Sequence, residues 1–133
     1  MEYLPRDTIR ENRLPGRVVQ NAVGHNSALS SERMTVSFCR YSAESGPMAP
    51  HNHAEESVVV LDCRDAWVEW GTGPEELTCR QDLRVGDLLH FPPLEWHVFR
   101  YGEGGFLDAL CIYGQVTNIR PEEIGSSGTK RSE

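Results

Sequence analysis

Short apolar runs broken by turn residues constrain this chain more than any other feature. The runs are rich in β-branched and aromatic residues, and Gly, Pro, Asn or Asp interrupt them about every eight to twelve residues. No segment has the periodicity of a helix longer than two turns. This spacing predicts an all-β fold, an antiparallel sandwich or barrel, and 133 residues suit one domain with a hydrophobic core.

The runs also predict where the strands lie and how the chain divides. We expect strands at residues 17–23, 34–41, 57–62, 65–70, 77–83, 88–91, 97–101 and 106–113, with residues 102–105 as a hairpin loop. Residues 1–33 are predicted to be an N-terminal arm with one strand, and residues 34–115 the barrel. Residues 116–133 are predicted to be a C-terminal segment with a disordered tail from about residue 125.

Charge and cysteine usage exclude several classes of function. The net charge is −7, so we expect no nucleic-acid partner. No apolar run approaches transmembrane length and no secretory signal is visible, so we expect no membrane partner. The four cysteines include no CxxC pair, which is typical of free thiols rather than of a zinc ribbon. Together these features predict a cytoplasmic protein.

Two histidines at residues 51 and 53 are the first sign of chemistry. Residues two apart on an extended chain point to the same face, so His51 and His53 can converge on one point. Glu55 and Glu56 follow at once, and His97 comes about forty residues later. Three imidazoles and a carboxylate suit a divalent transition metal with open positions for water or substrate. The alternative is that these histidines share no task.

The segment that ends at His97 carries a recognisable motif. Gly86, Pro92 and His97 have the spacing of G(X)5PXG(X)2H(X)3N, with Leu94 in the place of the second glycine and Tyr101 in the place of the asparagine. This is the second motif of the cupin superfamily, which the chain resembles over roughly residues 34–115. The resemblance implies a jelly-roll barrel, the double-stranded β-helix, around a metal site.

The first cupin motif, G(X)5HXH(X)3,4E(X)6G, is matched with shorter gaps. Gly46 lies one residue too close to His51, Glu56 lies one residue too close to His53, and Cys63 stands where the last glycine is usual. The resemblance implies that the metal ligands are His51, His53, Glu56 and His97. Glu56 is preferred because the apolar run that follows fits the family's strand best from there, and Glu55 is the alternative.

The implied ligand set indicates a class of chemistry and leaves the reaction open. Three neutral imidazoles and one carboxylate around a divalent ion leave a net charge near +1, which favours an anionic substrate. Such a centre can polarise a carbonyl, lower the pKa of a bound water, or bind O₂ if the metal is iron. The ligands suit Fe, Mn, Ni, Co or Zn without selecting among them.

We therefore expect an isomerase, lyase or dioxygenase acting on a small anionic or carbohydrate-derived metabolite, because this superfamily spans such reactions. The alternative is a non-catalytic cupin that binds or senses a small ligand or sugar, because fold does not fix function.

Four further residues are candidates for catalytic roles. Arg40 can clamp a substrate carboxylate with two hydrogen bonds, or lie at the wet end of its strand. Tyr41, His90 and Tyr113 can donate or accept a proton. Each also has a plain alternative, because both tyrosines are ordinary strand residues and His90 can cap a turn or face outward.

Two aromatic residues are candidates for the substrate pocket. Trp96 adjoins the ligand His97, and Phe99 follows it on the same predicted strand, although packing in the barrel is the alternative for both. We also expect a homodimer, with the strand at residues 17–23 pairing or exchanging across a two-fold axis, because open sheet edges favour pairing.

Overall fold

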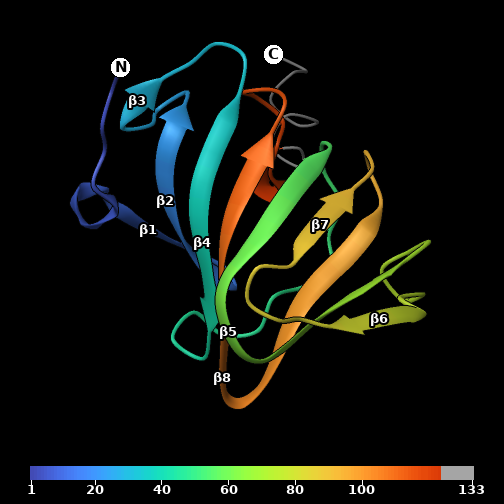
Figure 1. Ribbon diagram of the computed structural model, residues 1–133. Coiled ribbons are helices and arrows are strands. Elements are labelled where there is room, and N and C mark those ends of the chain that lie inside the picture. Colours follow the sequence, from blue (N-terminus) through green and yellow to red (C-terminus); the bar gives the residue numbers. More distant parts are fainter. Residues whose placement is uncertain (124–133) are drawn as a thin grey trace.

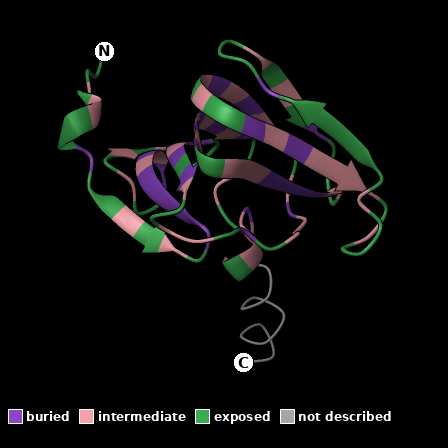
Figure 2. Ribbon diagram, turned by 90° about the horizontal axis from the view of Figure 1, so that it is seen from below, coloured by how far each residue is buried: buried purple, intermediate pink, exposed green. Residues whose placement is uncertain are grey.

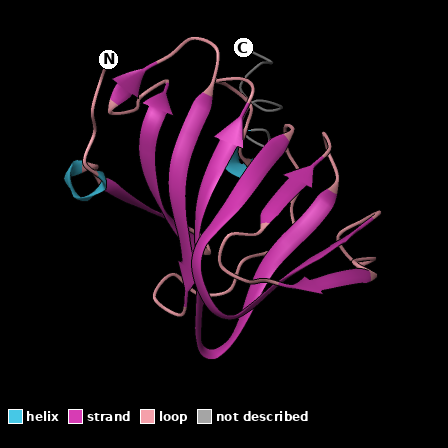
Figure 3. Cartoon of the chain, in the orientation of Figure 1, coloured by secondary structure: helices cyan, strands magenta, loops and turns pink. Residues whose placement is uncertain are grey.

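The computed structural model describes residues 1–123, which fold into one strongly curved sheet with almost no helix (Figures 1 and 3). The elements are η1 (Arg6–Thr8), β1 (Glu11–Leu14), β2 (Arg17–Gly24), β3 (Leu29–Ser30), β4 (Thr35–Ser42), β5 (Glu56–Gly71), β6 (Cys79–Asp82), β7 (Leu88–Phe91) and β8 (Trp96–Tyr113). All strand pairs are antiparallel except the short β2–β3 pair. The predicted all-β jelly-roll class is confirmed.

Two long strands, β5 and β8, hold the fold together. The strand order is β1-β2-β4-β8-β5-β6, and β7 pairs with the first part of β5. Figure 1 shows both long strands bending at the lower edge, so that each contributes to two facing parts of the sheet. The sequence therefore predicted these strands in the right places but divided each into two.

The predicted hairpin loop at residues 102–105 is wrong, because β8 runs through it without a break. A side chain at Gly102 would place its Cβ 1.9 Å from Asp65 Oδ2, and one at Gly105 would lie 2.5 Å from the Arg64 carbonyl oxygen. Gly104 has a φ of +76°, which favours glycine. The glycines thus let β5 and β8 bend against each other at close range, rather than reversing the chain.

The core lies between the facing parts of the sheet, as the buried stripes in Figure 2 show. Burial alternates along β4 and along the first half of β5, as expected for strands with one face inward. Val58, Val98 and Leu107 are fully buried. Each such side chain stabilises the fold by about 1.5–3 kcal/mol relative to an exposed position.

The N-terminal part of the chain is more ordered than predicted. Residues 1–33 contribute β1, β2 and β3 instead of a single strand. Strand β2 pairs with β1 on one side and with β4 on the other, so its edges are occupied within the chain. In the described part of the chain, β2 thus offers little free edge for a second copy to pair with. The homodimer, by pairing or by exchange of this strand, stays a prediction.

Two remaining predictions concern the ends of the chain and membranes. The disordered tail predicted from about residue 125 lies outside the described residues. Within residues 1–123, no helix has the length and apolar character that a membrane crossing requires.

Candidate metal centre

A backbone bridge brings the two histidine segments together. The His51 amide donates to the His97 carbonyl oxygen at 3.0 Å, and the His97 amide donates to the His51 carbonyl oxygen at 2.9 Å. The Leu94 amide donates to the His53 carbonyl oxygen at 2.8 Å. Leu94 has a φ of +65°, so it takes the left-handed conformation for which the cupin motif has glycine. The motif's turn is therefore kept although its glycine is absent.

Three imidazoles converge inside the barrel. One nitrogen from each of His51, His53 and His97 lies within 4.8 Å of the other two. The Nδ1 atoms hydrogen-bond backbone carbonyl oxygens, of Ala49 at 2.9 Å, Ala54 at 2.8 Å and Glu95 at 2.8 Å respectively. A carbonyl oxygen only accepts, so each Nδ1 carries the proton and each Nε2 keeps its lone pair free. This is how proteins orient histidines that ligate a metal.

The burial of the three rings keeps them neutral. Burial lowers the pKa of His51 to about 4 and that of His97 to about 2, and it also lowers the pKa of His53. Among the described residues, His97 Nε2 is one of two buried side-chain atoms without a hydrogen-bond partner. A buried nitrogen of this kind costs free energy unless something binds it. The donor set therefore fits a transition-metal ion.

The carboxylate of Glu56 adjoins this group, whereas that of Glu55 does not. Glu56 is 3% exposed, and its Oε1 lies 3.5 Å from His53 Nε2. Burial raises the pKa of the Glu56 carboxyl to about 8, although hydrogen bonds from Tyr113 and Cys111 act to lower it. Glu55 is exposed and accepts a 2.8 Å hydrogen bond from His90 Nε2. Of the two glutamates, Glu56 is therefore the one that lies beside the histidines, although within residues 1–123 the group of mutually close ligand atoms contains the three histidines alone. Glu56 as a fourth ligand stays a prediction.

The space beside the imidazoles is small. Its free volume is about 10 Å³, which is roughly the room that one water molecule needs. Tyr41, Phe99 and Tyr113, three of the residues predicted to act in or line the site, line this inner cavity. Burial raises the pKa of both tyrosines well above the usual 10, so both hydroxyls stay protonated. The full lining is Arg17, Cys39, Tyr41, Met48, His51, His53, Glu56, Phe99, Tyr113, Arg120 and Pro121.

The other three predicted residues do not line the inner cavity. Arg40 is exposed and lines a separate polar pocket, because its position on β4 alternates with the inward-facing Cys39 and Tyr41. His90 is exposed on β7, where its Nδ1 lies 2.8 Å from the Ser57 hydroxyl. Trp96 precedes the inward-facing His97, and neighbours on a strand face opposite ways.

Two arginines at the inner cavity were not predicted. Arg17 opens β2, and its side chain is 6% exposed. Arg120 comes from the segment that follows β8. The local sequence gives little to distinguish either arginine from a surface residue. For Arg17 the one signal is its place at the start of a predicted strand, directly after Pro15 and Gly16.

The four cysteines are free, as predicted. Cys39 and Cys111 are buried on β4 and β8, Cys63 is half-buried, and Cys79 is exposed. Two of the four therefore belong to the core, where free cysteines are common.

Comparisons with known proteins find similarity in structure but not in sequence. No protein-family model matches the chain, and no curated protein sequence matches it significantly. The polyketide cyclase RemF from Streptomyces resistomycificus is 19% identical with a TM-score of 0.67, covering 85% of this chain and 78% of its own. A protein from Planctomyces limnophilus is 18% identical with a TM-score of 0.67, covering 92% and 94%.

Solved structures with lower TM-scores are also similar to this chain. The DMSP lyase DddQ from Ruegeria pomeroyi is 17% identical with a TM-score of 0.57, covering 84% of this chain and 54% of its own. Oxalate decarboxylase and HppE are also similar in structure. These are cupin-fold proteins, and this chain has the cupin fold with a group of three histidines inside it. At such low identity, the likeness establishes the fold alone.

Proposed function

We propose that this chain is a metal-dependent cupin enzyme. It binds one divalent transition metal through His51, His53, Glu56 and His97, and acts on a small anionic or carbohydrate-derived metabolite. The observation that carries the proposal is the shared orientation of the three imidazoles. Their Nδ1 atoms are all held by backbone carbonyls, and one nitrogen of each ring lies within 4.8 Å of the other two. A metal held there would polarise a substrate carbonyl or lower the pKa of a bound water.

The reaction class we propose is isomerase, lyase or dioxygenase chemistry. Some structural neighbours are named as a cyclase, a lyase and a decarboxylase, and another as an Fe(II) protein with a substrate. Fe, Mn, Ni, Co and Zn all suit imidazole and carboxylate ligands.

The polar lining of the inner cavity supports catalysis over binding alone. The Tyr41 and Tyr113 hydroxyls keep their protons because burial raises the pKa of both. Each can therefore donate a hydrogen bond to a developing oxyanion. Arg17 brings positive charge to the same cavity and suits an anionic substrate.

The test is loss of turnover with loss of the metal. Metal-loaded protein would be screened against small keto acids, hydroxy acids and phosphorylated sugars, and each activity found repeated with His51→Ala protein and with a chelator. His90→Ala serves as a control, since His90 is an exposed histidine outside the inner cavity. Activity should disappear in the first two cases and persist in the control; turnover that survives chelation would refute the proposal.

A second candidate function is a non-catalytic cupin that binds or senses a small ligand. One observation favours it: the free volume beside the histidines is only about 10 Å³, whereas a pocket of about 440 Å³, lined by Asn21 and Arg120 among others, has room for a ligand away from them. Tight binding without turnover, unaffected by chelation, would select this function. For either one we propose the cytoplasm, supported by four free thiols in a chain of this size.

A further inference from the structure

Residues 114–123, which we call the strap, lie across one end of the inner cavity. Arg120 and Pro121 of the strap line that cavity directly. Ile119 is 2% exposed and packs into the hydrophobic core, so it anchors the strap from the middle. The Thr35 hydroxyl donates to the Gln115 carbonyl oxygen at 2.8 Å and fixes the strap's beginning.

A charged pair holds the far end of the strap. Arg17 donates two hydrogen bonds to Glu122, with NH1 to Oε2 and NH2 to Oε1 both at 2.8 Å. The Arg17 side chain is 6% exposed and that of Glu122 is 40% exposed. The strap therefore brings a half-exposed carboxylate to a buried guanidinium that belongs to the barrel. Two-pronged pairing of this kind is the geometry with which arginine recognises carboxylates in general.

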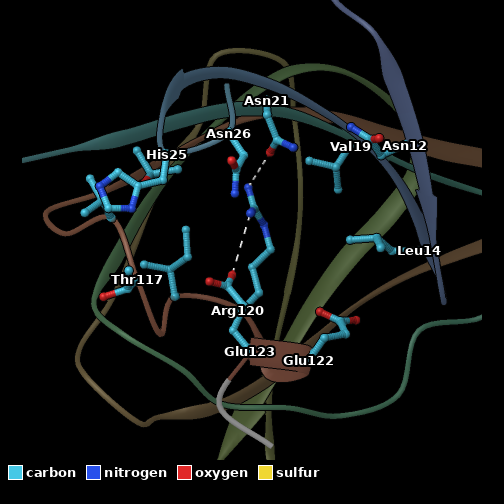
Figure 4. Close-up of a pocket in the computed structure, with 13 residues that line it drawn as sticks. Asn12, Leu14, Val19, Asn21, His25, Asn26, Thr117, Arg120, Glu122 and Glu123 are labelled. Atoms are coloured by element: carbon cyan, nitrogen blue, oxygen red, sulfur yellow. Dashed lines mark hydrogen bonds and ion pairs between the residues drawn. The ribbon is translucent and has the colours of Figure 1, made fainter. Parts of the chain in front are cut away.

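The strap also divides a larger space. On its other side lies an outer pocket of about 440 Å³, between the strap and strands β1 and β2. Figure 4 shows Arg120 reaching across this pocket to Asn21, whose Oδ1 accepts a 2.9 Å hydrogen bond, with Glu122 at the pocket's floor. Arg120 lines both the outer pocket and the inner cavity. Movement of the strap would join the two into a space of the size that usually holds small-molecule ligands.

The position of Arg17 relative to the histidines matters most. Arg17, His51 and His53 line the same inner cavity, and Glu122 reaches Arg17 from the strap. A ligand carboxylate that Arg17 held on its cavity side would therefore lie beside the imidazoles, where an anionic substrate of the proposed enzyme would bind.

We propose that Arg17 is the carboxylate-recognising residue of this site and that Glu122 occupies it as an internal competitor. A ligand carboxylate displaces Glu122 from Arg17, the strap swings away, and the inner cavity opens to the outer pocket. Specificity for carboxylate ligands follows, since a neutral ligand cannot replace Glu122 on the guanidinium. This deepens the proposed function, on which it rests for the identity of the ligand as substrate.

The fraction of molecules in which the strap is closed determines how strongly Glu122 weakens the binding of an outside carboxylate. If the strap is closed in about nine molecules of ten, an outside carboxylate binds about tenfold more weakly than it would to an open strap. A tethered carboxylate competes at an effective concentration in the millimolar range, which is sufficient against a weak ligand. Removing the Glu122 charge should therefore tighten carboxylate binding about tenfold.

The test uses metal-free protein and acetate, which reproduces the Glu122 head group. Binding is followed by NMR titration in the wild type, in Glu122→Gln and in the double variant Arg17→Met/Glu122→Gln. Acetamide is the neutral control ligand. The exposed Arg13–Glu44 pair provides the matched control variant, Glu44→Gln. Amide hydrogen exchange of residues 114–123 reports opening of the strap.

We expect Glu122→Gln to bind acetate about tenfold more tightly than the wild type, with faster exchange in the strap and no gain for acetamide. The double variant should lose the gain, and Glu44→Gln should match the wild type. If the methionine variant fails to fold, Arg17→Lys/Glu122→Gln replaces it. Lysine keeps the charge without the two-pronged geometry, so this variant should keep only part of the gain in acetate binding. Equal acetate binding in Glu122→Gln and wild type would overturn the proposal, as would unchanged exchange in the strap or a gain that persists without Arg17.

The result of the acetate titrations can be separated from the question of whether the protein binds a metal. The titrations contain no metal, so they can support the role of Arg17 even if metal analysis finds none. Conversely, a protein that holds metal but shows none of these acetate effects loses only the strap proposal. Metal content measured on Arg17→Met protein should equal that of the wild type, because Arg17 is not one of the proposed ligands.

Discussion

Replacing Glu56 with glutamine should change how many protons the protein releases when it binds metal. In the metal-free protein, burial raises the pKa of the Glu56 carboxyl to about 8. A carboxyl group must lose its proton to ligate a cation. If Glu56 is a ligand, metal binding near neutral pH must therefore expel the Glu56 proton, whereas the glutamine variant has none to expel.

The magnitude follows from the pKa values of the site. With a pKa of about 8, Glu56 is about 90% protonated near pH 7, so wild-type protein should release about 0.9 proton per metal bound. His51 and His97 add almost nothing, because pKa values of about 4 and about 2 leave them neutral there. At about pH 9 the release should fall to roughly 0.1 proton, as Glu56 is then already ionised.

Calorimetry in buffers of different ionisation enthalpy measures this release directly. The control is Glu55→Gln, which removes an exposed carboxylate one residue away that pairs with His90. We expect about 0.9 proton for the wild type and for Glu55→Gln, and close to zero for Glu56→Gln. Equal release from the wild type and Glu56→Gln would refute the assignment of Glu56, and loss of release in Glu55→Gln would move the acidic ligand to Glu55.

Three further predictions concern stability, each measured by chemical unfolding of the metal-free protein. Leu107→Ala should lower the free energy of unfolding by about 2–5 kcal/mol because Leu107 is fully buried, whereas Leu88→Ala, at an exposed position, should change it by under about 0.5 kcal/mol. Gly16→Ala should destabilise more than Gly46→Ala: both glycines have positive φ, but only at Gly16 would a Cβ meet another backbone atom, 2.8 Å away. The free energy of unfolding should also fall as the pH drops below about 6.5, because the unfolded chain then binds a proton that folded His97, with a pKa of about 2, does not. His97 alone accounts for about 2 kcal/mol at about pH 5, and the loss should be smaller by that amount in His97→Phe; equal pH dependence of both proteins would contradict this.

The convergence of the three histidines was predictable because local spacing determines where their side chains point. His51 and His53 share a face through the two-residue period, and the motif around Gly86 and Pro92 places His97 on a strand. The choice between Glu55 and Glu56 follows from the same two-residue alternation of a strand. Glu56 lies on the inward face with Val58 and Val60, so it is buried, and Glu55 falls outside.

Other features depend on contacts that are distant in sequence, and these could not be predicted. Arg17 pairs with Glu122, 105 residues away, and neither residue stands in a recognisable pattern. The glycines at residues 102–105 have the composition of a turn, but pairing of β8 along β5 keeps the strand continuous. Arg40 shares a face of β4 with Val36 and Phe38, and only the pairing of β4 with β2 and β8 decides that the opposite face points inward.

Metal content tests the central claim most directly. Untagged protein purified without chelator would be analysed by elemental mass spectrometry, together with His51→Ala/His97→Ala protein and with His90→Ala as the control for an exposed histidine. We predict one equivalent of a divalent transition metal in the wild type and in the control, and none in the double variant. A folded wild-type protein that holds no metal and takes up none on titration would contradict the assignment of a metal centre.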